Sequence, residues 1–210
     1  TVDEINAKLA ACFTFDNFRT QQEQGVIVDE AFRADGLERV LYKCPHCLAE
    51  GTTVGSGTTV VCKNCGASYE LTELGYLNAL NIQGKFTHVP DWYAWQRQCV
   101  REELENGTYS LDVPVKVIIM KGTKAVYDIG NGRLTHGLDG FRLVAADGKL
   151  DYRQSAKASY GLYADYNWYE LGDIICIGDN DYLYYCFPQG ADGVVAKTRL
   201  ATEELYKMLK

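Results

Sequence analysis

Four cysteines, arranged as two Cys-x-x-Cys pairs, are the residues of this sequence best suited to chemistry. The pairs are Cys44-Pro-His-Cys47 and Cys62-Lys-Asn-Cys65, with fourteen residues between them. Each pair can turn two sulfur atoms towards one metal ion, and two pairs complete the tetrahedral shell of a structural zinc site. Such a shell leaves no open coordination position, so we expect the zinc to stabilise the fold and not to catalyse a reaction.

The segment between the two pairs supports this interpretation. Two β-prone runs flank Gly55-Ser56-Gly57, which is typical of a hairpin. Gly66 follows the second pair, at a point where a knuckle turn needs a positive φ that glycine adopts at little cost. The alternatives are two redox dithiols or unrelated buried cysteines. Because both pairs and the hairpin agree, we predict a zinc ribbon over residues 41–71.

The other cysteines indicate a reducing compartment. They are single residues in apolar or aromatic surroundings, namely Cys12, Cys99, Cys176 and Cys186. Buried free thiols in a cytoplasmic protein explain this scatter better than disulfide bonds do. The first residues are polar and acidic and show no signal-peptide pattern. We therefore expect a cytoplasmic location.

No catalytic motif is visible among the histidines. The sequence has three, His46, His88 and His136. With four cysteines filling the metal shell, we expect His46 to face solvent and His88 to make a structural hydrogen bond. A nucleophile elbow, a phosphate-binding glycine loop and a His-Glu-x-x-His motif are all missing from the sequence.

The N-terminal part of the chain, residues 1–109, is predicted to combine helices with the ribbon. Residues 2–13 carry apolar side chains at helical spacing behind a capping box, and a second short helix is expected from Asp16 to Gly25. We further expect a strand over 26–28 and a short helix running to Leu80. A longer helix is expected from Asp91 to Asn106-Gly107, and the domain should end just after it, near Asn106–Ser110.

The second part, residues 110–210, changes to short β-prone runs separated by Gly and Asp-Gly turns. Eight or nine such strands, among them Asn167–Glu170 and Val194–Ala196, indicate an antiparallel sandwich or barrel. A helix near 199–209 should close it. The predicted fold class is therefore α+β, and strands that end in a helix resemble the pleckstrin-homology-like arrangement.

Aromatic residues gather before Leu171 and form a candidate binding surface. Alternation along strands would turn some of them outwards, where rings can stack on a sugar or lie at a lipid interface. The alternative is that they surround a small core. The candidates are Tyr160, Tyr163, Tyr166, Trp168 and Tyr169.

Charge argues against nucleic acid as a partner. The net charge is −7, and the ribbon segment balances Lys43 and Lys63 against Glu50 and Glu70. Ribbons that bind nucleic acid need a basic face, and no segment supplies one. The sequence also lacks a run of eighteen apolar residues, so it predicts no transmembrane helix.

Several stretches of the chain resemble a known family. They include Phe32-Arg33-Ala34-Asp35-Gly36-Leu37 just before the ribbon, together with the segments Asp16–Phe18, Val28–Pro45, Trp168–Asp173, Tyr184–Pro188 and Lys197–Tyr206. The chain resembles the C-terminal extension of phospholipid and glycerol acyltransferases from Gram-positive gut bacteria. Those proteins are similar to 1-acyl-glycerol-3-phosphate acyltransferases, and the resemblance covers essentially the whole chain.

The catalytic signature of that family, His-x-x-x-x-Asp, has no counterpart here. Five positions after the three histidines stand Gly51, Tyr93 and Phe141. The resemblance therefore implies a non-catalytic accessory domain whose partner is the acyltransferase domain of the same polypeptide, and through it the inner face of the membrane. Two rival hypotheses remain: a stand-alone module that binds a lipid headgroup, glycan or protein through the β domain, and a ribbon that binds nucleic acid.

Overall fold

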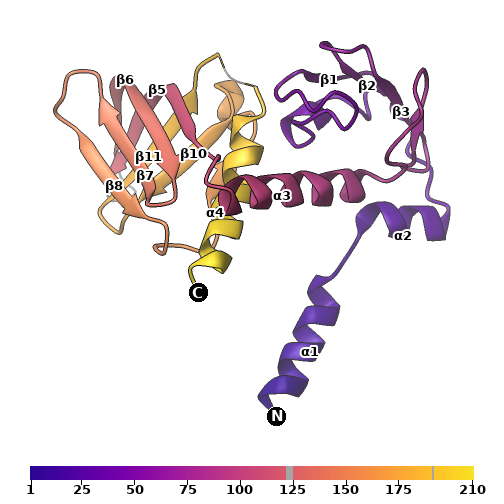
Figure 1. Ribbon diagram of the computed structural model, residues 1–210, viewed down its shortest axis with the longest axis horizontal. Helices are drawn as coiled ribbons and strands as arrows, with labels where there is room; N and C mark the ends of the chain where they lie inside the picture. Colours follow the sequence, from indigo (N-terminus) through magenta and orange to yellow (C-terminus); the bar gives the residue numbers. More distant parts are fainter. Residues whose placement is uncertain (122–124, 191) are drawn as a thin grey trace.

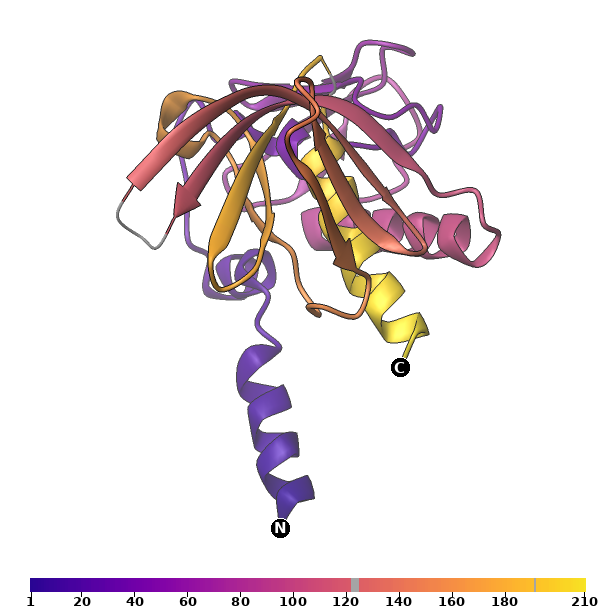
Figure 2. The ribbon, with the colours of Figure 1, turned by 90° about the vertical axis from the view of Figure 1, so that its left-hand side faces the viewer.

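The computed structural model describes residues 1–121, 125–190 and 192–210. Its N-terminal helix α1 (Val2–Phe13) projects away from the rest of the molecule, as Figures 1 and 2 show. The predicted capping box is present, since the Thr1 hydroxyl accepts from the Glu4 N–H and the Glu4 carboxylate accepts from the Thr1 amine. Every residue of α1 is exposed. A short helix α2 (Asn17–Gln24) then leads to the body of the protein.

A small antiparallel sheet carries the metal-ligand region. A 3-10 turn η1 (Leu37–Arg39) precedes four strands paired in sequence order: β1 (Thr53–Ser56), β2 (Thr59–Cys62), β3 (Ser68–Leu71) and β4 (Leu77–Ala79). The strands are only three or four residues long, so the sheet depends on packing for stability. That packing centres on Trp92, which is 1% exposed and lies 5.2 Å from Tyr69 between ring centroids.

A seven-stranded antiparallel half-barrel forms the second unit. Its order is β8-β7-β6-β5-β11-β10-β9, so β5, the first of these strands in the sequence, pairs with β11, the last. The strands are β5 (Leu111–Lys121), β6 (Ala125–Gly137), β7 (Gly140–Ala145), β8 (Asp151–Ser155), β9 (Tyr163–Asp165), β10 (Ile174–Gly178) and β11 (Tyr182–Pro188). The final helix α4 (Val194–Met208) packs its buried side into the same core. The α+β class and the C-terminal helix are thus confirmed.

Helix α3 (Val89–Glu105) joins the two units and contributes to both cores (Figure 1). Its first half buries Val89 and Trp92 against the small sheet, and its second half buries Val100 and Leu104 in the half-barrel. Ion pairs fix it to α4, because Arg97 lies 2.6 Å from Glu203 and 3.0 Å from Glu204. The predicted boundary after residue 109 falls just beyond this shared helix.

Two predictions for the half-barrel are wrong in detail. Residues Asn167–Glu170, expected as a strand, include the 3-10 turn η2 (Trp168–Glu170), because Asn167, Tyr169 and Glu170 have left-handed φ angles that a strand does not accommodate. The run Val194–Ala196 is the first turn of α4, which therefore begins five residues before 199. Its β-prone residues are helical because Val195 and Ala196 are buried in the half-barrel core.

Two predictions for the first part of the chain are also wrong. Residues 26–28 form no strand, although the N–H of Val28 donates to the carbonyl of Glu73. The expected helix before Leu80 is strand β4, because Gly75, with a φ of 78°, turns the chain back on β3. Alternation of apolar residues was too short here to separate a strand from a helix.

Candidate metal centre

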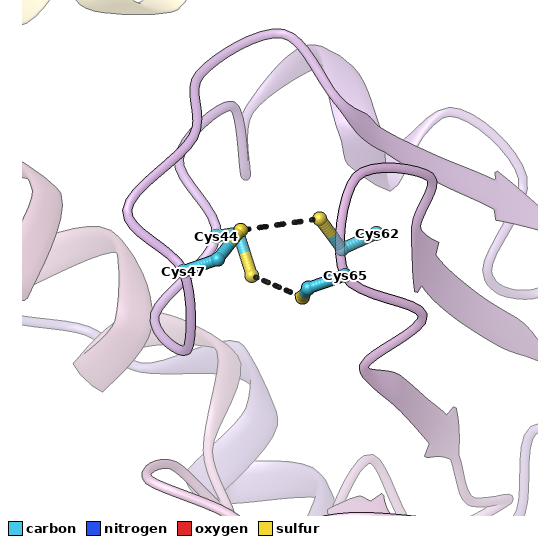
Figure 3. A group of neighbouring side chains, drawn as sticks. All are labelled: Cys44, Cys47, Cys62 and Cys65. Atoms are coloured by element: carbon cyan, nitrogen blue, oxygen red, sulfur yellow. Dashed lines mark hydrogen bonds between the residues drawn. The ribbon is translucent and has the colours of Figure 1, made fainter.

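The four predicted cysteines meet at one point, between the loop that precedes β1 and the end of β2 (Figure 3). Their sulfur atoms all lie within 4.8 Å of one another. Across the two pairs, Sγ of Cys44 lies 3.8 Å from Sγ of Cys65, and Sγ of Cys47 lies 3.7 Å from Sγ of Cys62. In each pair the first cysteine, Cys44 or Cys62, is buried, and the second, Cys47 or Cys65, is accessible to solvent.

These separations fit a tetrahedral metal ion. A zinc ion with sulfur ligands at about 2.3 Å places those sulfurs about 3.8 Å apart. A disulfide would need about 2.0 Å, so the thiols are spaced as ligands and not as bonded pairs. All four donors are soft sulfur atoms, which favours zinc over calcium or magnesium. The cluster is compatible with a metal such as zinc.

Each cysteine pair forms the same backbone turn. In the first, the N–H of Leu48 donates to the carbonyl of Cys44, and in the second the N–H of Gly66 donates to that of Cys62. Both residues have left-handed φ angles, 64° for Leu48 and 76° for Gly66. Gly66 was predicted from its type, whereas a leucine gives no such signal and was missed. Each turn therefore directs both sulfur atoms of its pair towards the cluster.

Polar groups around the sulfurs favour thiolates. The side chain of Asn64 donates to Sγ of Cys47 at 3.4 Å, and this bond is the main reason that the pKa of Cys47 falls to about 6. The Thr52 hydroxyl lies 3.3 Å from Sγ of Cys62. Burial has the opposite effect and raises the pKa of Cys44 to about 12, so that thiol needs a metal ion to ionise.

Two side chains of α3, Trp92 and Gln96, hydrogen-bond to the backbone just before the first cysteine pair, and we call these contacts the clamp. Trp92 donates its indole N–H to the carbonyl of Lys43 at 2.9 Å. Gln96, which is fully buried, accepts from the N–H of Lys43 at 2.9 Å and donates to the carbonyl of Val40 at 2.8 Å. Sequence reasoning missed this clamp. The available signal was a glutamine four residues after Trp92, on the apolar face of a helix.

Four half-buried charges tie the same loop to the half-barrel unit. Lys43 lies 3.1 Å from Glu50 and 3.2 Å from Glu103 of α3. Lys197 of α4 lies 2.8 Å from Glu50 and 2.7 Å from Glu103. The residues on either side of the first cysteine pair therefore share one closed ring of ion pairs with both long helices, which fixes the metal region on the second unit.

The three histidines are not part of the cysteine cluster, and each lies in a different environment. His46 is exposed, as expected. His88 is buried and bonds to Asp16 at 2.6 Å through Nε2, a structural contact. His136 stacks on Phe141 and bonds to the Tyr109 hydroxyl at 2.9 Å. Within the described ranges, the cysteine cluster is the one group of such ligands that could hold a metal.

The aromatic candidates separate into three places. Tyr160 contacts Tyr206 of α4, edge to face at 5.7 Å. Tyr166 is half-buried against the half-barrel core. Tyr163, Trp168 and Tyr169 belong to the opposite face of the sheet. The five residues are therefore not one surface, although three of them lie together.

Comparison with protein-family models and with curated proteins finds no match for this chain. Among the residues that the structure describes, no helix has the length and apolar character needed to cross a bilayer.

Proposed function

We propose that this chain is a zinc-stabilised, non-catalytic accessory domain of an acyltransferase that acts on 1-acyl-glycerol-3-phosphate. The observation that carries the first half of the proposal is the closed four-sulfur cluster, whose cross-pair separations of 3.8 and 3.7 Å fit tetrahedral zinc. With four protein ligands, the ion has no position for substrate or activated water, so its contribution is to folding.

The second half of the proposal rests on the resemblance of sequence segments to the C-terminal extension of those enzymes. The histidines support a non-catalytic role. His88 and His136 are buried in structural contacts, and none of the three is followed by aspartate at the spacing that the acyltransferase signature requires. The chain would position or regulate the catalytic domain in the cytoplasm, at the inner face of the membrane that the whole enzyme contacts. The acidic charge continues to argue against a nucleic-acid partner.

The test uses the polypeptide that carries this chain beside an acyltransferase domain. Replacing Cys62 and Cys65 by Ser should remove the metal and reduce acyl transfer from acyl-CoA to lysophosphatidate. The same two-residue replacement at Cys12 and Cys99, which lie outside the cluster, is the matched control and should leave transfer unchanged. Acyl transfer by the purified chain alone, abolished when one of its own histidines is changed, would contradict the proposal.

A further inference from the structure

The face of the half-barrel that points away from α4 carries a second apolar cluster. Its buried members are Ile118, Ile174, Cys176, Tyr185 and Phe187. Strand pairing aligns Tyr163 of β9 with Cys176, and Cys176 with Tyr185, so the three share this face. An antiparallel sheet can leave such a face to water, and here it is apolar instead.

Aromatic side chains of η2 lie over this face. Trp168 packs on Tyr185 and Phe187, with ring centroids 5.0 and 5.9 Å away. Tyr169 stands perpendicular to Trp168, at 87° and 4.7 Å. Tyr163 is 56% exposed and Tyr169 is 81% exposed, so two rings of the group are open to solvent. We define Tyr163, Trp168, Tyr169 and Tyr185 as the aromatic patch.

The backbone of η2 is held in an uncommon conformation. Asn167, Tyr169 and Glu170 have φ angles of 55°, 44° and 62°, all in the left-handed region. The turn is fixed because the N–H of Asn167 donates to Asp173 at 2.8 Å, and Arg39 of the first unit bonds to the same carboxylate at 2.6 Å. Such strain persists where the surrounding structure imposes it, commonly at binding sites.

The charges beside the aromatic patch are negative. Asp165 lies two residues after Tyr163 on β9, so both side chains project from the same face, and exposed Glu170 belongs to η2 itself. Neither carboxylate forms an ion pair with any residue in the described part of the chain. The nearby cations are engaged, since Arg39 pairs with Asp173, and Lys116, on the same face, pairs with Asp128.

We propose that the aromatic patch binds a cationic side chain, arginine or lysine, from a partner polypeptide. Ring faces attract cations, and the flanking Asp165 and Glu170 add opposite charge at the same place. An anionic lipid surface would require free Lys or Arg beside the rings, which the described residues do not supply there. A neutral glycan would use the rings and could hydrogen-bond to the carboxylates, but it has no positive charge to complement them.

The test measures fluorescence anisotropy of a fluorescein-labelled peptide of alternating arginine and glycine, mixed with the whole chain. The double variant Tyr163→Ala/Tyr169→Ala should weaken binding about tenfold or more. Tyr160→Ala is the matched control, because Tyr160 is 51% exposed and lies outside the patch. All these proteins have the same net charge, so general attraction of the peptide to an acidic protein is constant.

Two further arms separate the proposal from its rivals. Asp165→Asn/Glu170→Gln should also weaken binding and should reduce its dependence on salt. Tyr169→Ala alone removes a largely exposed ring, so it leaves the core intact and should still weaken the peptide complex several-fold. Equal affinity of the wild type and the double tyrosine variant, or an equal loss in Tyr160→Ala, would overturn the proposal. So would patch-dependent binding of phosphatidylglycerol vesicles or of maltoheptaose in place of the peptide.

Discussion

Replacing Gln96 by Leu tests the clamp that α3 places on the metal region. Leu is close to Gln in volume and in helix propensity, so neither a cavity nor lost helix propensity explains an effect. The substitution leaves the Lys43 N–H and the Val40 carbonyl without their partners, at a site where Gln96 is 0% exposed. Water cannot readily replace those partners.

The expected cost follows from those two groups. Leaving one buried donor or acceptor unpaired costs about 1–3 kcal/mol, so we expect Q96L to lower the free energy of unfolding by about 2–6 kcal/mol. The assay is urea denaturation of the zinc-loaded chain, read from the midpoint of the transition. Because Lys43 adjoins Cys44, release of zinc to a chromogenic chelator should also be faster in the variant.

The matched control lies on the same helix. Gln98 is exposed and bonds only to Glu102 one turn later, at 3.0 Å. Q98L should therefore change the free energy of unfolding by less than about 0.5 kcal/mol. If Q96L and Q98L have equal midpoints, or if Q96L is the more stable protein, the reasoning about the clamp is refuted.

Other predictions concern the half-barrel unit and its junction with the metal region. Burial lowers the pKa of His136 to about 4, so the unfolded chain binds a proton that the folded chain excludes. Stability should therefore fall as pH drops from about 6.5 towards 4, and His136→Asn, measured by denaturation at several pH values, should flatten that part of the profile. Gly193→Ala should destabilise more than Gly25→Ala, because both have left-handed φ angles but a Cβ at 193 would lie 2.4 Å from Cβ of Tyr42, whereas nothing lies within 4 Å at 25. Equal melting temperatures for the two would contradict this. Lys197→Met should cost about 1–2 kcal/mol and less at high salt, since it breaks a half-buried ion-pair ring, and a salt-independent loss would point to packing instead.

The sequence was most informative where a local rule has one physical solution. Two Cys-x-x-Cys turns on either side of a hairpin can place four sulfurs around one metal ion, and Gly66 identifies its turn because no other residue adopts that φ at so little cost. The capping box predicted the start of α1 for the same reason.

Where the predictions failed, tertiary contacts decided the outcome. Val194–Ala196 is β-prone in composition but helical in the protein, since burial against the half-barrel outweighs a propensity of a few tenths of a kcal/mol. The left-handed angles of the η2 turn are fixed in part by a distant residue, because Arg39 of the first unit bonds to the Asp173 carboxylate that also accepts from the Asn167 N–H. No local pattern encodes them.

The candidate aromatic surface shows the same limit. Alternation correctly implies that some rings point outwards, yet it cannot say that Tyr160 turns to α4 while Tyr163 joins Trp168 on the opposite face. That division depends on which strands pair, and the pairing of β5 with β11 at the centre of the half-barrel joins residues more than sixty positions apart in sequence.

The zinc-edge X-ray absorption spectrum of the purified chain tests the central claim most directly. We expect one zinc shell of four sulfur atoms at about 2.3 Å, with no nitrogen contribution. The Cys62→Ser variant, which keeps His46 and the other three cysteines, should lose that four-sulfur shell. A chain without zinc, a shell in which the imidazole of His46 replaces a sulfur, or a disulfide within either pair would contradict the account.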